Sequence, residues 1–378
     1  MSKSNVFVTD AGYKHALTIV RSLGRRELSI HCGSSSASPP ISSFSRYAKK
    51  TLIYPDPKAF PDLFKVFIVK SSRKHDYRVV IPVGYNTTFA LSRIKYEIEG
   101  AEIPVADFKS LDIAASKKKT VLLAEKLGVP TPHTVVPESS SDLESQAFSY
   151  PLVVKGVEES GFVRYSRNLQ DLKRNLNEIY REQNEYPLIQ EYIPGVGYGF
   201  FALFDNGEPR AVFMHRRIRE YPLTGGPSTC AESVYEPKLL DYGLKLLKAL
   251  NWHGVAMVEF RRDLRDSKFK LMEINPKFWG SLDLAIASGV DFPFLLYKMA
   301  VEGEKKQVFG YRIGVKFMWP FPDDLLRVID MPSKTKSFIC DLFDPRVVKN
   351  IDFNDLSPNA VQLAGATHLL IRKLVENI

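Results

Sequence analysis

Cysteine is scarce in this sequence, and its placement excludes several classes of protein. Only three cysteines occur in 378 residues, Cys32, Cys230 and Cys340; they form no CxxC pair, and no histidine lies at metal-ligand spacing from them. An odd number of distant cysteines fits neither a disulfide framework nor a zinc-binding module. The pattern instead predicts thiols that are buried as small apolar side chains in a reducing compartment, and hence a cytoplasmic protein.

Long apolar runs and basic clusters are missing as well. The first residues, MSKSNVFVTD, contain no hydrophobic leader, and no stretch approaches the roughly 20 apolar residues that a membrane helix needs. The net charge is +9, from 52 Lys and Arg against 43 Asp and Glu, but the basic residues are spread along the chain without interleaved aromatics. We therefore expect no membrane and no nucleic-acid partner, and attribute the charge to a small anion such as a nucleotide or acidic metabolite.

The first part of the sequence alternates strands and helices. A β-branched run at 5–9 leads through a turn at 10–12 into a helical pattern over 16–23 and a second apolar stretch at 28–30. Strand, helix and strand within about 30 residues form a βαβ unit, which predicts a parallel sheet in an α/β fold. Another buried strand is expected at 79–83. The turn lacks the GxGxxG pattern, so a dinucleotide site is not supported.

The second part consists of short strands separated by glycine turns. PLVVKG and PLIQEYIPG each predict a strand, and a hairpin is expected at Asn206-Gly207. A helix over about 237–250 then precedes strands at 255–261 and 268–274. Between the two parts, a single helix is expected from Ala114 to Leu127. This arrangement predicts separate α+β lobes after the parallel sheet.

Two of these strands carry acidic residues among apolar ones. Glu259 lies in VAMVEFRR, and Glu273 and Asn275 lie in KLMEINP. Residues two apart in a strand point to one face, so Glu273 and Asn275 project together, and an adjacent strand can place Glu259 opposite them. Buried carboxylates need a cation, and three oxygen ligands on one face suit Mg²⁺. The alternative is that arginines such as Arg261 and Arg262 neutralise the pair.

Basic residues near these strands suit an anionic ligand. Lys155 ends the strand PLVVK and can reach phosphate oxygens, although an isolated lysine after a strand is more often a surface residue. In HRRIREYPLTGGPST, Arg217 and Arg219 are expected on one strand face, next to a loop with exposed backbone N–H groups. Such a face can bind phosphate or carboxylate. A solvated basic strand with an ordinary turn is the alternative. The loop residues concerned are Gly225, Gly226 and Ser228.

The order of these motifs resembles the ATP-grasp superfamily over about residues 1–310, and MEINPKFWGS is the most specific of them. The resemblance implies an ATP-grasp fold with a two-lobed nucleotide cleft. It assigns Lys117 and Lys155 to the phosphates, Glu191 and Ile193 to adenine, and Glu259, Glu273 and Asn275 to magnesium. Four regions are implied: a Rossmann-like pre-ATP-grasp domain at 1–112, a small lobe at 113–194, a large lobe with the metal site at 195–310, and a C-terminal extension at 311–378.

The segment around Arg217 and the WGSLD run also resemble a branch of carboxylate–amine ligases that has not been characterised. That resemblance implies ATP and Mg²⁺, with Mn²⁺ as a substitute, and small-molecule acid and amine substrates. Arg217, Arg219 or Lys277 would stabilise the transferred phosphoryl group or bind the acid, and the 225–228 loop would bind the same anion. The short loop after Lys155 and the glycine at position 197, where relatives carry a ribose-binding Glu, depart from the family pattern. An ATP-binding regulator, a phosphotransferase and assembly into a homo-oligomer therefore stay open.

Overall fold

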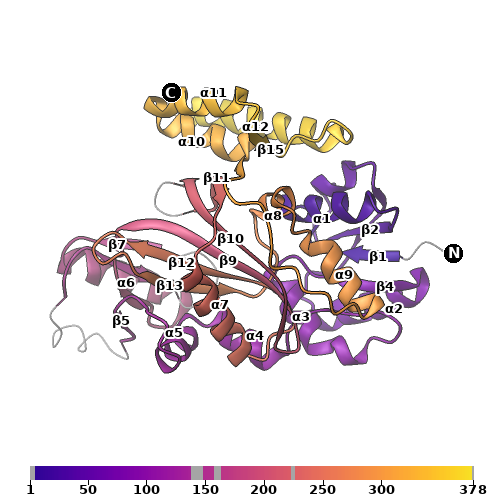
Figure 1. Cartoon of the computed structure of the whole chain (residues 1–378), viewed down its shortest axis with the longest axis horizontal. Helices are drawn as coiled ribbons and strands as arrows, with labels where there is room; N and C mark the ends of the chain where they lie inside the picture. The colour runs from indigo at the N-terminus through magenta and orange to yellow at the C-terminus, as the bar shows by residue number, and fades with distance from the viewer. Residues whose placement is uncertain (1–4, 138–147, 157–162, 223–225, 377–378) are drawn as a thin grey trace.

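Figure 1 shows the computed structural model, which describes residues 5–137, 148–156, 163–222 and 226–376. The N-terminal domain is built on a parallel sheet of four strands in the order β3-β2-β1-β4. The βαβ unit and its parallel pairing are confirmed. The elements of this domain are β1 (Asn5–Val8), α1 (Lys14–Gly24), β2 (Ser29–Ser34), η1 (Ile41–Phe44), β3 (Ala48–Ile53), α2 (Pro61–His75), β4 (Tyr77–Ile81), α3 (Tyr85–Ile94), η2 (Lys95–Glu97) and α4 (Phe108–Ala115).

The small lobe follows and contains an antiparallel sheet in the order β5-β8-β6-β7. Its elements are α5 (Lys117–Lys126), β5 (Thr134–Val135), β6 (Leu152–Lys155), β7 (Val163–Ser166), α6 (Leu169–Gln183) and β8 (Leu188–Glu191). The single helix expected over 114–127 is in fact two, α4 and α5. Ser116 is extended between them and caps α5 by accepting a hydrogen bond from the backbone N of Lys119 at 3.3 Å. Serine is a favoured residue at this position of a helix.

A seven-stranded sheet in the order β13-β12-β9-β10-β11-β14-β15 forms the large lobe and continues into the C-terminal extension. The large-lobe elements are β9 (Gly195–Asp205), β10 (Glu208–Glu220), β11 (Ser228–Ser233), α7 (Pro237–Ala249), β12 (Gly254–Asp263), β13 (Phe269–Asn275), α8 (Leu282–Ser288) and α9 (Phe292–Glu302). Those of the extension are β14 (Lys316–Met318), η4 (Pro320–Asp324), α10 (Leu325–Asp330), η5 (Pro332–Lys334), α11 (Thr335–Phe343), β15 (Val347–Lys349) and α12 (Leu356–Glu376).

Both faces of the large-lobe sheet are buried, and strand β9 shows how. Phe201 and Leu203 lie in a core shared with the N-terminal sheet, α8 and α9, whereas Phe200 and Phe204 lie in a second core with α7. This is the alternation of a strand, whose successive side chains point to opposite faces. Because one core joins the N-terminal domain to the large lobe, α1 and the sheet edge of the large lobe are held together at the site described below.

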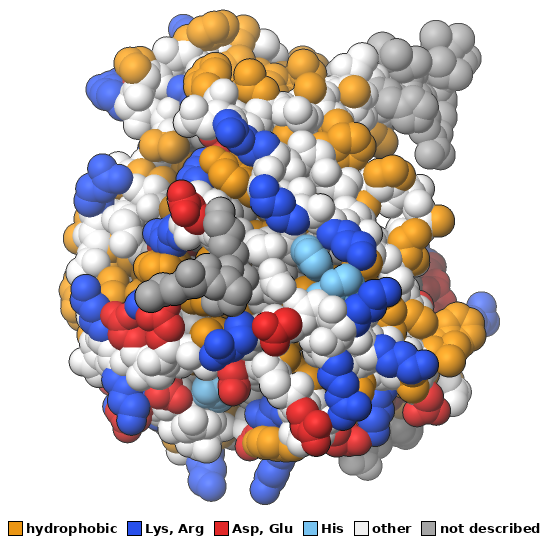
Figure 2. All heavy atoms as spheres, turned by 90° about the vertical axis from the view of Figure 1, so that its right-hand side faces the viewer, with side chains coloured by type: hydrophobic (Ala, Val, Ile, Leu, Met, Phe, Trp, Pro, Cys, Tyr) orange, Lys and Arg blue, Asp and Glu red, His pale blue; other side chains and the backbone are white. Residues whose placement is uncertain are grey.

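The extension is placed above the rest of the molecule in Figure 1. Hydrophobic side chains gather at the top of the face that Figure 2 shows, over this extension, while Lys and Arg are interspersed with Asp and Glu below it. Phe343 and Phe353 of the extension are 77% and 83% exposed. The expectation of a homo-oligomer stays a prediction.

Two further expectations concern burial. Cys32 and Cys230 are buried as expected, but Cys340 is exposed on α11, so the prediction of three buried thiols is wrong for that residue. Within the described ranges, no single helix is long and apolar enough to cross a membrane. Helices α8 and α9 pass that test only as a pair, which is bent by 86°, and both contribute side chains to the core shared with the N-terminal domain.

Candidate functional site

A cavity of about 600 Å³ lies between the small and large lobes, with the start of α1 and the segment after β13 also contributing to its wall. This volume is typical of a small-molecule or cofactor site. The cavity brings together most of the residues that the sequence singles out. They are Lys117, Lys155, Glu191, Ile193, Arg217, Gly226, Ser228, Glu259, Glu273, Asn275 and Lys277.

The acidic residues meet as the strand periodicity predicts. Glu259 of β12 is paired directly with Glu273 of β13, and Met257 is paired with Asn275. The side-chain amide of Asn275 donates to Glu273 Oε1 at 2.8 Å. Three oxygen-bearing side chains therefore converge on one face of two antiparallel strands, which is a donor set that fits Mg²⁺ together with phosphate oxygens and water.

The surroundings of Glu259 and Glu273 shift the pKa values of the two carboxyl groups in opposite directions. Burial, together with the nearby Glu273, raises the pKa of Glu259 despite its contact with Arg217. Burial also acts to raise the pKa of Glu273, but Lys155 and the hydrogen bond from Asn275 outweigh it and lower that pKa. Glu273 is thus the carboxylate that stays ionised most readily. An ionised, amide-oriented carboxylate is the better ligand for a hard cation.

Lysines supply the opposite charge at the small-lobe side of the cavity. Lys155 is the last residue of β6, and burial lowers its pKa although Glu273 and Glu259 act to raise it. Lys117 is the first residue of α5, where Ser116 fixes the start of the helix. Among the residues that the structure describes, six Lys or Arg side chains and four Glu side chains line the cavity, and this described lining has an excess of two positive charges. A dianion such as Mg-ATP complements that excess.

The apolar end of the cavity is formed by side chains from β6, from β13 and from the segment that follows β8. Ile193 is 3% exposed and lies in the lining with Val153 and Met272. Glu191 also lines the cavity, but its carboxylate is engaged by Arg265 at 2.6 Å and by the backbone N of His133 at 3.3 Å. The flat apolar wall suits a base ring, with backbone groups of β8 as its polar contacts.

Arg217 and Arg219 do not share a face, contrary to expectation. On β11, Arg217 pairs with Ala231 and Arg219 with the adjacent Cys230, because the register shifts between the two arginines. Adjacent strand residues point to opposite faces, so this bulge turns Arg219 away. Arg217 lines the cavity and contacts Glu259 at 2.7 Å.

Arg219 is not among the residues that line the cavity, and its guanidinium binds Asp324 at 2.7 Å and Asp341. Of the two arginines expected at the anion site, only Arg217 lines the cavity. Of the loop residues, Gly226 and Ser228 line the cavity, and the Gly226 carbonyl accepts from Arg217 at 3.1 Å. Gly225 lies outside the described residues, as do 157–162 of the loop that follows Lys155.

Within the described ranges, the contacts of Arg261 and Arg262 are with groups other than Glu259 and Glu273. Arg261 donates to the Gly195 carbonyl at 3.0 Å, and the shortest ion-pair distance of Arg262 is 4.0 Å, to Glu236. Arg217, from a different strand, is the basic partner of Glu259 instead. Sequence reasoning on the two strands alone cannot find it, since the contact depends on the order of strands in the sheet.

Several lining residues were missed by the sequence analysis, although the same periodicity points to some of them. His215 lies two residues before Arg217 on the same strand, lines the cavity and hydrogen-bonds Ser281 at 2.9 Å. Burial lowers the pKa of His215 to about 3, so it is neutral near pH 7. Glu220 lines the cavity beside Gly197, where an added Cβ would lie 2.8 Å from Arg217 Cδ and 2.9 Å from Glu220 Oε1. Glycine at 197 therefore makes room for these two side chains.

Comparison with known protein families finds a match in the large lobe. Residues 183–319 match a family described as ATP-grasp in the biosynthetic pathway with Ter operon. The chain is also similar to the large chain of carbamoyl phosphate synthase from Archaeoglobus fulgidus, with 22% identity over 315 residues. This alignment covers 80% of the chain but 28% of that protein, so the chain spans less than a third of the relative's length.

Solved structures share the fold of about four fifths of the chain at low identity. The L-amino acid ligase from Bacillus licheniformis superposes with a TM-score of 0.64 at 16% identity, over 81% of this chain and 78% of that one. A biotin carboxylase from Campylobacter jejuni, solved as a β-γ-ATP complex, gives 0.67 at 13% identity, over 83% and 74%. N5-carboxyaminoimidazole synthetase from Staphylococcus aureus, complexed with ADP, gives 0.64 at 14%, over 83% and 80%. At these identities the likeness establishes a shared fold.

Proposed function

We propose that this chain, which has the ATP-grasp fold, binds Mg-ATP in the cavity and uses it to activate a carboxylate for attack by an amine. The observation that carries the proposal is the Glu259–Glu273 pair with Asn275, facing two lysines across one cavity. The ligase reaction also accords with the names of the proteins that share the fold, among them an L-amino acid ligase.

In this proposal each group of residues has its own part. Glu259, Glu273 and Asn275 hold the metal; when bound, Mg²⁺ (or Mn²⁺) neutralises phosphate charge and orients the phosphate oxygens. Lys155 and Lys117 bind the phosphates, and Ile193 with the backbone of β8 holds the base. Arg217, with Lys277 beside it in the lining, binds the oxygens of the group being transferred.

The chemistry then follows in two balanced steps. A substrate carboxylate oxygen attacks the γ-phosphorus of ATP, ADP leaves, and the acid becomes an acylphosphate. An amine attacks the acyl carbon, phosphate leaves and an amide forms, with the amine proton passing to solvent or to a basic group. The protein's contribution is mainly position and charge, since phosphoryl transfer needs little covalent help from side chains. In this proposal Gly226 and Ser228, which line the cavity, bind the acid or the phosphate.

The Glu273→Gln variant tests the metal assignment. We expect it to fold, because removing one of two facing carboxylates relieves repulsion, and to lose turnover by at least about a hundredfold. The measurement is ADP release with ATP, Mg²⁺ and a mixed pool of carboxylic acids and amines. Glu232→Gln is the matched control, since Glu232 lies on β11 of the same sheet and pairs with Arg216 away from the cavity. Equal ADP release by Glu273→Gln and the parent would refute the assignment.

The products separate the ligase from the other two functions. A ligase releases ADP only when acid and amine are both present. A phosphotransferase forms a stable phosphorylated product without amine, and a regulator binds ATP without turnover. Mass spectrometry of the same incubation distinguishes these results, and release of AMP instead of ADP would contradict the acylphosphate route.

A further inference from the structure

Strand β10 connects the cavity to the C-terminal extension. Its bulge sends Arg217 into the cavity and Arg219 to the opposite face, two residues further on. Arg219 Nε lies 3.0 and 3.1 Å from the two carboxylate oxygens of Asp324, and Nη2 lies 2.7 Å from one of them. Asp324 is fully buried. The position of the bulge, and so of Arg217, is therefore fixed by a residue outside the large lobe.

Asp324 also holds the neighbouring strand. The hydroxyl of Thr229 on β11 donates to Asp324 Oδ1 at 2.7 Å, and the backbone N of Trp319 donates to the Thr229 carbonyl at 2.9 Å. Thr229 directly follows Ser228, which lines the cavity, and Ser228 follows the loop whose Gly226 carbonyl meets Arg217. One carboxylate thus anchors both strands that carry the acid-binding side of the site.

Asp323, the residue before it, reaches the other wall. The Asp323 carboxylate accepts a hydrogen bond from Lys14 at the start of α1. The Lys14 side chain in turn lies against Gly280, with its Cε 3.3 Å from the position that a Cβ on Gly280 would take. His15, next to Lys14, lines the cavity, as does Gly280. Two consecutive aspartates of the extension therefore bind the N-terminal domain on one side and the large lobe on the other.

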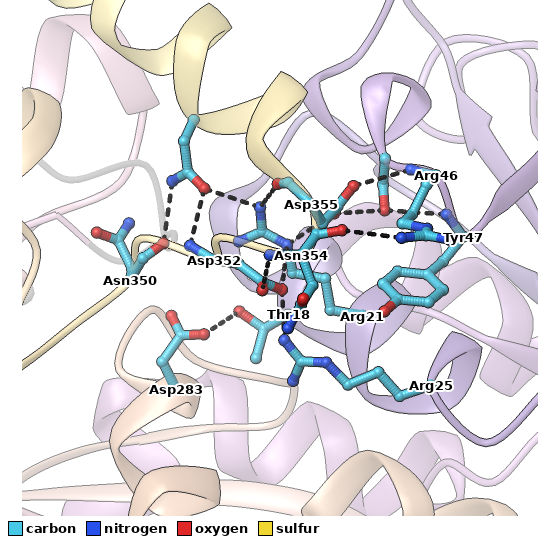
Figure 3. Close-up of polar contacts among 12 residues, drawn as sticks. Thr18, Arg21, Arg25, Arg46, Tyr47, Asp283, Asn350, Asp352, Asn354 and Asp355 are labelled. Carbon is cyan, nitrogen blue, oxygen red and sulfur yellow. Dashed lines mark hydrogen bonds and ion pairs between the residues drawn. The ribbon is translucent and has the colours of Figure 1, made fainter.

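The far end of the extension is fixed to α1 as well. Arg21 of α1 binds Asp355 at 2.9 Å through Nε and donates to its backbone carbonyl at 2.7 Å, while Ser45 donates to the same carboxylate at 2.7 Å. Figure 3 shows Arg21 of α1 and Asp355, just before α12, pointing toward one another, with Arg46 and Tyr47 close by. The segment with Asp323 and Asp324 is held at both of its ends, by strand pairing at β14 and by this network.

We propose that Asp323 and Asp324 are positioning residues for the acid–amine end of the cavity, setting the distance between its N-terminal and large-lobe walls. The expected loss of turnover rests on the proposed function, whereas the expected change in the position of the two walls does not. The nucleotide end, formed by β6 and β8, has no part in these contacts. Loss of either aspartate is therefore expected to impair turnover while nucleotide binding is retained.

Asp324→Asn is the direct test. We expect ADP release with the acid–amine pool to fall on the order of tenfold to a hundredfold, as displaced reacting groups do, with the Kd for Mg-ADP unchanged. Hydrogen exchange should accelerate in residues 212–222 and 226–233 and not in β6 or β8. The control is Asp344→Asn, the same substitution in the same extension, because the Asp344 carboxylate pairs with Arg346 two residues away. It is expected to match the parent in all three measurements.

Asp324→Asn removes a charged partner of buried Arg219 and could unfold the protein. Asp323→Asn is the second variant, which tests the proposal in that case. Lys14, which would lose its partner, is 22% exposed, so its charge stays in contact with water after Asp323 is neutralised. Reduced ADP release, faster exchange at the start of α1 and an unchanged Kd for Mg-ADP support the proposal. Parental exchange and turnover in Asp323→Asn, or an equal loss of Mg-ADP binding, would overturn it. If the parent itself releases no ADP, the proposed ligase function fails, and the exchange measurements still decide the positioning role.

Discussion

At the scale of single residues, Arg217 is the side chain that joins the metal-type carboxylates to the loop at 226–228. It contacts Glu259 at 2.7 Å and the Gly226 carbonyl at 3.1 Å. Glu259 and nearby Glu220 raise the pKa of Arg217, although burial opposes them, so the guanidinium stays charged. A permanent charge beside two carboxylates can stabilise a transferring phosphoryl group without a proton transfer.

We predict that Arg217→Met lowers the rate of ADP release by about a hundredfold or more, because one fixed charge at the transferred group is lost. Arg216→Met is the control on the adjacent residue. Arg216 points to the other side of β10 and is half exposed where it pairs with Glu232, so its loss should cost no more than about 1 kcal/mol of stability. Steady-state ADP release and the thermal midpoint are measured for both. Equal rate losses in the two variants would contradict the assignment of Arg217.

Residue-scale prediction from the sequence succeeded where one periodicity decides the outcome. Glu273 and Asn275 share a face, and Glu259 lies opposite, because the pairing is regular from Met257 and Asn275 to Glu259 and Glu273 and the register shifts only beyond Glu259. Arg219 was misplaced because a bulge adds a residue that no sequence pattern marks. His215 was within reach of the same reasoning that placed Arg217, whereas the contact between Arg217 and Glu259 depends on β9 lying between β10 and β12.

At the scale of elements, two glycines in helices give opposite predictions. Gly243 lies in α7 where an added Cβ would stand 2.2 Å from Cδ1 of the buried Phe200 ring, while Gly365 in α12 has no atom within 4 Å of that position. Alanine normally stabilises a helix relative to glycine. At Gly243 an alanine would favour the helix but would clash with Phe200, because α7 lies close to β9 at this point.

We therefore expect Gly243→Ala to destabilise the protein by about 1–3 kcal/mol through overpacking. Gly365→Ala is expected to stabilise α12 by roughly 0.5–1 kcal/mol. Thermal unfolding followed by circular dichroism measures the first, and hydrogen exchange of residues 356–376 measures the second. A stabilised Gly243→Ala would show that the contact between α7 and β9 is looser than described. The two substitutions are chemically identical, so each serves as the control for the other.

At the scale of the whole molecule, the N-terminal domain and the hairpin of the large lobe can be predicted from the sequence to a greater extent than the C-terminal extension. The βαβ unit and the hairpin between β9 and β10 are local, and turn residues and strand periodicity are enough to predict them. Strands β14 and β15 are three residues each and join the large-lobe sheet through pairings with β11 and with one another. Such short strands carry no periodic pattern, and their partners are distant in the chain. The extension was for that reason the least predictable region.

The network of Figure 3 makes the attachment of the extension sensitive to pH. Burial acts to raise the pKa of Asp355, but hydrogen bonds from Arg21, the backbone of Arg46 and Ser45 outweigh it and lower that pKa. A carboxyl whose pKa is lower in the folded than in the unfolded state stabilises the fold above its unfolded pKa, about 3.9 for aspartate. That stabilisation is lost as the pH falls through the folded value.

We predict that Asp355→Asn destabilises the protein at pH 7 by about 1–3 kcal/mol, because buried Arg21 then keeps only Asp352, whose carboxylate lies 3.6 Å from its Nε, as an ionic partner. The difference from the parent should shrink as the pH is lowered below 4, where the parent's own carboxyl becomes protonated. Urea unfolding at pH 7, 5 and 3 measures this, with hydrogen exchange of α12 reporting the extension itself. Asp241→Asn is the control: Asp241 pairs with Lys245 on α7, and both side chains are about half exposed, so the unfolding curves of this variant and of the parent should nearly coincide. A gap for Asp355→Asn that is equally large at pH 3 would show that packing, rather than the ion pair, attaches the extension to α1.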